Sequence, residues 1–502
     1  MDPEFNVLFV TADQFRGDCL GTAGHPVVRT PHLDRLAAGG TRFARHFANA
    51  VPCAPSRASL YTGMYLMNHR AVSNGTPLDD RHDNVARVAR RLGYEPALFG
   101  YTDTGIDPRT VPAGDPRLRS YDGVLPGFDP VCDLPEGAPL AWLDWRWGRG
   151  TAVPDDWRTF SNRQAPNTKW RTQYGADETQ TAYLTDRVLD FVDDSARRSQ
   201  GWFAHVSYLR PHPPVLAPAP YDTMYDPATV PAPARAVTPD AEGAQHPVLG
   251  TMLMHPMLAS PADPQRQREL QATYYGMVSE VDHHVGRLLD WIDASGAADR
   301  TLVVFTADHG ELLGDHWMVE KISWFASSFH VPLIVRGPGV TAGTVDAMTE
   351  HVDVLPTICE LLGAEIPLQC DGRSLGPWLR REVPTRWREE VRHELDLRDP
   401  ASTFLEEMFG IGLEECSLAV LRDRHGSYVQ FAGDHAFPAI YFDLDADPAE
   451  TRNLAADPAY AATVLGYAQR MIAWRLRHAE RTLTGMKLTG HAGLVERRGD
   501  RR

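Results

Sequence analysis

Two apolar segments that end in the same three residues constrain the fold of this chain more than any other feature. Residues 6–10 (NVLFV) lead into Thr-Ala-Asp at Asp13, and residues 301–305 (TLVVF) lead into Thr-Ala-Asp at Asp308. Short continuous apolar runs of this kind are typical of buried parallel strands. Ligands of such sheets bind beyond the carboxyl ends of the strands. The sequence therefore predicts that both aspartates lie at a binding edge.

The segments between these two strands alternate between helical and strand patterns. Helices are predicted at 83–92 and 267–293, and strands at 96–100, 202–208 and 331–335. This alternation predicts an α/β fold with a mostly parallel sheet flanked by helices. Residues 104–180 lack clear periodicity, and we expect them to form an irregular insertion at the rim of the active site.

The pattern changes after about residue 380. Three short strand-like runs, CSLAVLRD, GSYVQFAG and IYFDLDAD, precede a predicted helix at 457–480. We therefore expect a catalytic domain over 1–380 and a smaller α+β domain with an antiparallel sheet over 381–502. The tail over 474–502 is rich in arginine, so it either frays or forms an arm on a neighbouring subunit.

Charge and composition exclude several classes of protein. The formal net charge of −16 disfavours binding to nucleic acid or to an anionic membrane surface. No segment approaches the roughly 20 apolar residues of a membrane helix, and the first residues lack the basic and apolar regions of a secretory signal. The six cysteines are dispersed and form no Cys-x-x-Cys pair, which predicts reduced thiols and a cytoplasmic protein.

Asp13, Asp308 and His309 form a candidate metal site. One isolated aspartate more commonly caps a helix or a turn, but two equivalent strand ends, one followed by histidine, favour a divalent cation. Gln14 could ligate through its carbonyl oxygen or lie just outside the ligand shell. Carboxylate and imidazole ligands favour manganese, while calcium, magnesium, iron and zinc are also compatible.

Cys53 lies in the stretch VPCAPSRASLYTG, residues 51–63. Pro55 suits the first turn of a helix, which places Cys53 at the helix N-terminus, where the dipole favours negative charge. Arg57 follows four residues later and returns to the same face. A packed thiol is one alternative. A thiolate nucleophile is another, although no adjacent histidine is visible in the sequence to activate it.

The segment CAPSR, followed by TG at 62–63, resembles the sulfatase signature Cys-x-Pro-Ser-Arg. The segments NVLFVTADQ, FTADHGELLGDH and YFDLDADPAETRNLA also resemble this family. The resemblance implies an alkaline-phosphatase-like fold and oxidation of Cys53 to formylglycine by a formylglycine-generating enzyme. It further implies that the aldehyde hydrate of residue 53 binds one metal ion as a fourth ligand and attacks phosphorus or sulfur, with the metal and Arg57 stabilising the charge.

Finer features resemble the bacterial phosphonate monoester hydrolases, which also act on phosphodiesters and sulfate esters and assemble as tetramers. These features are Asp-Gln after the first strand, Asp-His after the later strand and GYTD at 100–103. The resemblance implies that His212 protonates the leaving group and that Lys321 contacts the substrate anion or the leaving oxygen. It also implies that Asn74 and Tyr101 contact the substrate. Asp103 departs from the pattern, because we expect a substrate-facing threonine there.

The sequence thus predicts a metal-dependent formylglycine hydrolase of phosphonate monoesters and phosphodiesters with sulfate-ester hydrolase activity. An arylsulfatase or alkyl sulfatase with the same machinery is the alternative. A silent binding protein on this scaffold should have lost part of the machinery, which is complete here. A two-zinc phosphatase would require a serine or threonine nucleophile and more histidine and aspartate ligands than the sequence offers. The expected partners are a small ester substrate and further copies of the chain in a homotetramer.

Overall fold

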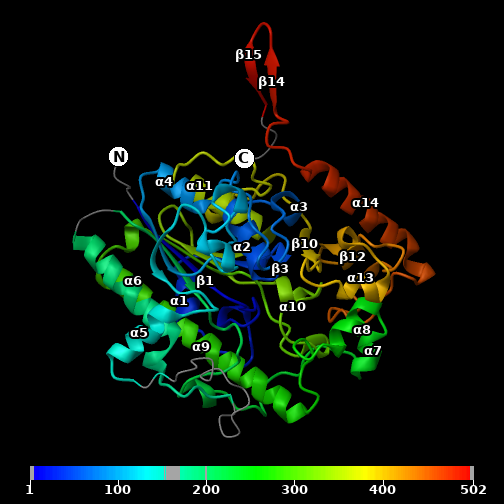
Figure 1. Cartoon of the computed structure of the whole chain (residues 1–502), viewed down its shortest axis with the longest axis horizontal. Coiled ribbons are helices and arrows are strands. Elements are labelled where there is room, and N and C mark those ends of the chain that lie inside the picture. The colour runs from blue at the N-terminus through cyan, green and yellow to red at the C-terminus, as the bar shows by residue number, and fades with distance from the viewer. Residues whose placement is uncertain (1–4, 152, 154–169, 198–200, 498–502) are drawn as a thin grey trace.

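The computed structural model describes residues 5–151, 153, 170–197 and 201–497 (Figure 1). An eight-stranded sheet with the order β5-β4-β6-β1-β7-β8-β2-β9 forms the centre of the larger part of the molecule. Its strands are β1 (Asn6–Ala12), β2 (Thr41–Phe47), β4 (Pro96–Gly100), β5 (Asp129–Asp133), β6 (Phe203–Tyr208), β7 (Thr301–Ala307), β8 (Leu333–Arg336) and β9 (Gly343–Glu350).

The sheet is mostly parallel, as the sequence predicts. β1 pairs in parallel with both β6 and β7, and only β8 runs antiparallel to its two neighbours. β1 and β7 lie fully buried near the middle of the sheet. The carboxyl ends of these two strands therefore meet at one edge, inside the molecule.

Alternate residues of β1 divide the core into two layers. Leu8 and Val10 belong to a cluster that includes residues of α1, α6 and α9. Val7 and Phe9 belong to a second cluster that includes residues of α2, α4 and α11. The sheet is thus covered by helices on both faces, as expected for parallel strands. The helices of the larger part are α1 (Pro31–Ala38), α2 (Cys53–Thr62), α3 (Leu66–His69), α4 (Val85–Arg91), α5 (Leu140–Gly148), α6 (Gln180–Arg197), α7 (Pro239–Gly243), α8 (Pro247–Met254), α9 (Pro264–Ala294), α10 (Ala326–Phe329), α11 (Val354–Leu361) and α12 (Gly376–Leu379).

A second, five-stranded sheet has the order β13-β12-β11-β10-β3. β10 (Val391–Asp396), β11 (Ser417–Arg422), β12 (Gly426–Phe431) and β13 (Ile440–Asp443) pair in antiparallel fashion, and α13 (Phe404–Phe409) and α14 (Ala461–His478) accompany them. The antiparallel C-terminal sheet is confirmed. β3 (Ala50–Val51), just before α2, joins this sheet beside β10, so a boundary at residue 380 does not separate every strand.

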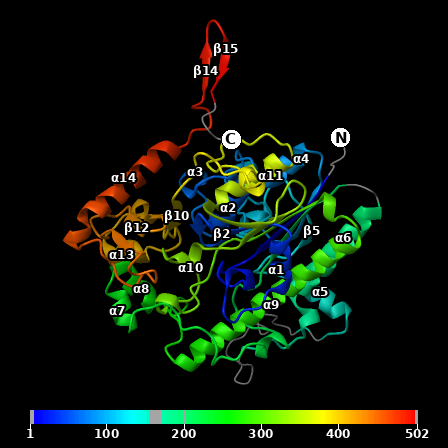
Figure 2. The same cartoon turned by 180° about the vertical axis from the view of Figure 1, so that it is seen from behind.

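Two segments contain more regular structure than the sequence predicts. The insertion over 104–180 includes β5, which extends the main sheet, and α5, while residues 152 and 154–169 lie outside the described part. The tail contains a hairpin of β14 (Met486–Thr489) and β15 (Gly493–Glu496), which stands away from the body in Figure 1 and Figure 2. Among the described residues, no helix combines the length and the low polarity needed to cross a membrane.

Candidate active site

The register of β1 against β7 places Asp13 beside Asp308. Ala12 pairs with Ala307, so the next residue of each strand lies at the same edge of the sheet. Asp308 is fully buried and Asp13 is 1% exposed. The backbone N–H groups of Gln14 and His309 both donate to Asp308 Oδ1, over 3.0 and 2.8 Å. The two strand ends thus deliver two carboxylates and one imidazole to a single point.

Cys53 is the first residue of α2, as the sequence predicts, and its thiol lies at that same point. Its Sγ is 3.2 Å from His309 Nε2 and 4.0 Å from Asp13 Oδ1. His309 Nε2 is 3.7 Å from Asp13 Oδ1 and 3.8 Å from Asp308 Oδ1. One ligand atom from each of these four residues lies within 4.8 Å of the others. The four predicted metal ligands therefore form one buried cluster.

His309, which the sequence predicts as a metal ligand, is the histidine beside Cys53, and it does not activate the thiol. Burial, followed by the charge of Asp13, raises the pKa of Cys53 well above its ordinary value. Burial, followed by the charge of Lys321, lowers the pKa of His309 to about 3. His309 Nδ1 lies 3.0 Å from the Gly310 carbonyl, a bond that assigns the proton to Nδ1 and leaves a lone pair on Nε2. The pair is therefore a thiol and a neutral imidazole.

The two buried carboxylates crowd each other. Burial and then the charge of Asp13 raise the pKa of Asp308 to about 7. Burial would also raise the pKa of Asp13, but the neighbouring His212 and Arg57 lower it below the ordinary value. Two carboxylates, an imidazole lone pair and a sulfur atom are a donor set that suits a divalent cation. A cation at this cluster would allow both carboxylates to ionise.

Arg57 lies one turn along α2 from Cys53 and is fully buried. Its Nε donates to Asp308 over 2.9 Å, one terminal nitrogen donates to Asp13 over 3.0 Å, and the other donates to Ser207 Oγ over 2.7 Å and to the Tyr101 carbonyl over 3.3 Å. Every nitrogen of the guanidinium thus has a protein acceptor. Arg57 therefore orients both carboxylates, in addition to the stabilisation of charge on the transferring group that the resemblance implies.

His212 and Lys321 come from different loops and lie side by side. Lys321 Nζ is 2.8 Å from His212 Nε2 and 2.8 Å from Gln14 Oε1. Burial opposes the lysine charge, but the surrounding groups, including Glu320 and Asp13, raise the pKa of Lys321 above its ordinary value. His212 Nδ1 lies 2.7 Å from the Pro213 carbonyl. These partners assign a proton to Nδ1 and make Nε2 the acceptor of a lysine proton.

Glu311 and Glu320 hold this pair, and neither is among the residues predicted from sequence. Glu311 Oε1 accepts from the backbone N–H groups of Leu313 and Glu320, both over 2.7 Å. Its other oxygen accepts from Gln14 Nε2. Glu320 forms an ion pair with Lys321 at 3.3 Å. Glu311 lies in the same segment as His309, which is the only sequence signal for it. These contacts make Gln14 a support for Lys321.

The three remaining predicted contacts divide into one rim residue and two buried residues. Asn74 is exposed, and its Oδ1 accepts from the backbone N–H of Ala54, 2.9 Å away, at the start of α2. Tyr101 is buried and its hydroxyl donates to Asp13 Oδ2 over 2.5 Å. Asp103 is 2% exposed, with Oδ2 3.6 Å from Arg57 Nε. Burial raises the pKa of Asp103 well above its ordinary value, which favours the protonated form of this carboxyl.

Solved structures of two phosphonate monoester hydrolases share this architecture. The enzyme of Agrobacterium radiobacter has a TM-score of 0.93 and 42% identity, covering 99% of this chain and 100% of that chain. The enzyme of Silicibacter pomeroyi has a TM-score of 0.92 and 41% identity, covering 98% of this chain and 99% of that chain. The fold and these relatives define an ester hydrolase of the alkaline phosphatase superfamily.

Sequence comparisons identify the family. The sulfatase family model matches residues 5–364, and the model for the C-terminal part of N-sulphoglucosamine sulphohydrolase matches residues 314–477. The multifunctional alkaline phosphatase superfamily protein PehA of Trinickia caryophylli is 41% identical, over 95% of this chain and 96% of that protein. The chain belongs to the sulfatase family.

Proposed function

We propose that this enzyme hydrolyses phosphonate monoesters and phosphodiesters, with additional activity on sulfate esters. The observation that carries the proposal is the buried cluster of Asp13, Cys53, Asp308 and His309, next to the Lys321–His212 pair. The names of the relatives with 41–42% identity support the phosphonate assignment, whereas the similar arylsulfatase of Clostridium perfringens is 25% identical.

The cluster fits one divalent metal ion, held by Asp13, Asp308, His309 and the side chain of residue 53. The donor atoms lie within 4.8 Å of one another, and the crowding of the two carboxylates favours a cation. A metal bound there acts as a Lewis acid toward the ester oxygens. The carboxylate and imidazole set favours manganese among the compatible ions. Arg57 keeps both carboxylates oriented toward this point.

The nucleophile is proposed to be formylglycine, made from Cys53 by a formylglycine-generating enzyme. Residue 53 is the first residue of α2, and the helix dipole stabilises developing negative charge at this end. The protonated thiol is itself a poor nucleophile, because the nucleophilic form of cysteine is the thiolate. The aldehyde hydrate would supply one hydroxyl for attack and a second hydroxyl whose deprotonation releases the product.

The Lys321–His212 pair is placed to handle the leaving group. Lys321 is cationic and its proton is already shared with His212 Nε2. An alkoxide leaving group requires a proton, and a positioned acid typically accelerates such a step by about 10²–10⁴-fold. We propose that a proton passes from Lys321 to His212 Nε2 and then from His212 to the leaving oxygen.

Substrate preference rests on charge. Phosphonate monoesters, phosphodiesters and sulfate monoesters each carry one negative charge at neutral pH, whereas phosphate monoesters carry close to two. A protonated Asp103, whose Oδ1 has no hydrogen-bond partner among the described residues, would add no repulsion to a monoanion. An arylsulfatase or alkyl sulfatase with the same machinery is the second candidate, favoured by the family match alone.

A paired kinetic assay separates the two candidates. The kcat/KM for an aryl phosphonate monoester is compared with that for the aryl sulfate with the same leaving group, using metal-loaded enzyme. We expect the phosphonate ester to be the better substrate. A higher kcat/KM for the sulfate would make the protein a sulfatase. Loss of both activities on chelation, and recovery with manganese, tests the metal.

We propose a cytoplasmic homotetramer. All six cysteines are free and buried, which suits a reducing compartment. An isolated two-stranded hairpin is marginal in water, and the β14–β15 hairpin exposes Leu488 by 82% and Leu494 by 59%. Docking of this hairpin on a neighbouring subunit would bury these side chains. The tail also carries eight basic residues against three acids, which suits the acidic surface of a second copy.

A further inference from the structure

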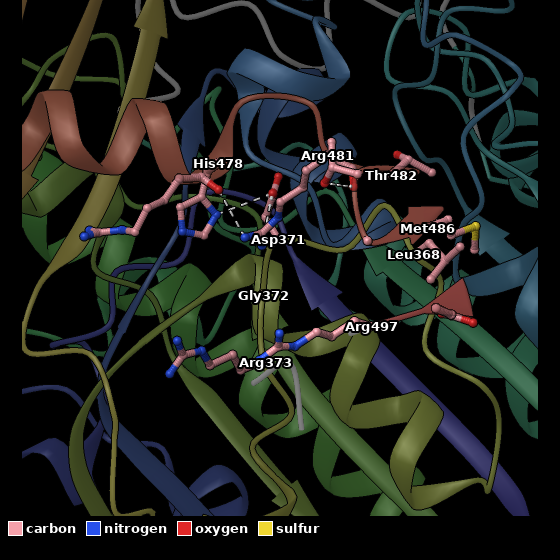
Figure 3. Close-up of a pocket in the computed structure, with 13 residues that line it drawn as sticks. Leu368, Asp371, Gly372, Arg373, His478, Arg481, Thr482, Met486 and Arg497 are labelled. Carbon is pink, nitrogen blue, oxygen red and sulfur yellow. Dashed lines mark hydrogen bonds and ion pairs between the residues drawn. The ribbon is translucent and has the colours of Figure 1, made fainter. Parts of the chain in front are cut away.

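A cavity of about 420 Å³ lies between the body of the protein and the root of the β14–β15 hairpin. One wall is the loop from Leu368 to Arg373, a second is the end of α14, and the third is the root of the hairpin, with Thr482, Thr484, Gly485, Met486, Glu496 and Arg497. Its volume is within the range of small-molecule sites. Figure 3 shows Arg373 and Arg497 below Asp371, with Leu368 and Met486 together to its right.

Positive charge dominates this cavity. Four arginines line it, Arg373, Arg477, Arg481 and Arg497, against two carboxylates. Asp371 is 3% exposed and accepts from the backbone N–H of Tyr65 over 3.0 Å. The same carboxylate is 3.7 Å from Arg481 and therefore neutralises one guanidinium.

Three guanidinium groups are left without a carboxylate. In the described part of the chain, Arg373, Arg477 and Arg497 form no ion pair, and the side chain of Arg373 reaches only the Arg386 carbonyl, at 3.5 Å. Burial, followed by the charge of Arg388, lowers the pKa of Arg373. Unpaired arginines that converge are unexpected in a chain with 66 acidic and 50 basic residues, because acidic partners are plentiful.

In an adjoining cavity, further arginines are paired with carboxylates. It shares Arg373 and Arg477 with the first cavity and is also lined by Arg388 and Arg392. There, Arg388 is paired with Asp353, and Arg392 is paired with Glu390. Arg388 and Arg392 of the adjoining cavity therefore have carboxylate partners, whereas Arg497, which forms no ion pair among the described residues, lines the first cavity and not the second. Arginine forks match phosphate and sulfate oxygens in geometry as well as in charge.

The cavity is separate from the catalytic cluster. The backbone N–H of Asp371 donates to the carbonyl of Gly63 over 2.7 Å, and Gly63 caps the C-terminus of α2. Cys53 is at the opposite end of that ten-residue helix, which is roughly 15 Å long at 1.5 Å per residue. A ligand bound in the cavity would therefore not contact residue 53.

We propose that this cavity is a second anion site, which binds a small molecule with two phosphate or sulfate groups and a compact apolar body. Arg373, from the body, and Arg497, from the tail, bind the anionic groups, and Leu368 and Met486 contact the apolar body. Because Arg497 comes from the tail, a bound ligand joins the hairpin root to the body.

Isothermal titration of the holoenzyme with m-benzenedisulfonate tests the proposal. Sulfonates are not esters, so the enzyme cannot hydrolyse the probe. We expect one site per chain in addition to any binding at the catalytic centre, weaker binding of benzenesulfonate, and weaker binding at higher ionic strength. Displacement by inorganic phosphate or by inorganic sulfate would support the site, and the stronger competitor would identify the chemical class of the ligand.

Substitutions at Arg373 and Arg497 separate a loss of ligand binding from a loss of folding. The Arg373→Gln/Arg497→Gln variant should bind the disulfonate about 10-fold more weakly or worse, because each charge-assisted contact is lost, with kcat and KM unchanged. Arg497→Gln alone changes only an exposed tail residue and should weaken binding in part. Arg117→Gln, which alters an exposed arginine paired with Asp115, is the matched control. Unchanged affinity in the double variant, or purely competitive inhibition with Ki equal to Kd, would overturn the proposal.

Discussion

Replacing Lys321 with methionine should slow esters with poor leaving groups far more than esters with good ones. Lys321 and His212 are 8% and 9% exposed, so water is poorly placed to substitute for either. A p-nitrophenolate leaves without a proton, whereas a methoxide does not. For a methyl ester we expect His212→Ala and Lys321→Met each to lower kcat/KM by about 10²–10⁴-fold. For the p-nitrophenyl ester the same variants should have much smaller effects.

The 2.8 Å hydrogen bond between the two groups sets the size of their coupling. A hydrogen bond to a charged group contributes about 1.5–3 kcal/mol, which corresponds to about 10- to 150-fold in rate. If the two single effects were independent, they would multiply in the double variant. We therefore expect the kcat/KM of the double variant to exceed that multiplied value by about this factor. The assay is kcat/KM for p-nitrophenyl and methyl esters of phenylphosphonate, with Lys487→Met as a control at an exposed lysine. Equal losses for both esters, or losses that simply multiply, would refute the proton relay.

Three further outcomes follow from the structure. Arg57→Met should lower the free energy of unfolding by about 3–5 kcal/mol, since it leaves two buried carboxylates without their cationic partner; chemical denaturation against Arg117→Met checks this, and equal stability of the two variants would contradict it. Burial raises the pKa of Asp282 from 3.8 to about 7, so the folded state holds a proton that the unfolded chain releases, and stability falls as pH rises through that window. Asp282→Asn should flatten this dependence in denaturation at several pH values, and an unchanged slope would count against the assignment. Deleting residues 482–502 should reduce the assembled mass in light scattering, and an unchanged mass would exclude the hairpin as a subunit contact.

The sequence predicts those parts of the site that depend on local patterns. Asp13 and Asp308 follow apolar strands, and neighbouring parallel strands bring such residues together. The position of Cys53 at the start of a helix follows from the proline two residues later. The predictions of the main sheet, its helices and the antiparallel C-terminal sheet are confirmed, because these elements also follow from local patterns of apolar residues.

Other features depend on loops that meet only in the folded chain. The contact between Cys53 and His309 joins residues 256 positions apart. All nitrogens of the Arg57 guanidinium find acceptors such as Ser207 because α2 packs closely against the sheet. No local sequence pattern predicts this packing. The sequence does not predict β5, because apolar and polar residues do not alternate clearly over its five residues and four of them are exposed.

We propose that residue 53 is converted to formylglycine and that the activity of the enzyme depends on this conversion. Peptide mass spectrometry of the segment around Cys53, paired with kcat on the aryl phosphonate ester, tests this directly. We predict a peptide lighter by the exchange of sulfur for oxygen and the loss of two hydrogens, with kcat proportional to the converted fraction across preparations. Fully active enzyme with an unmodified thiol at Cys53 would contradict the account.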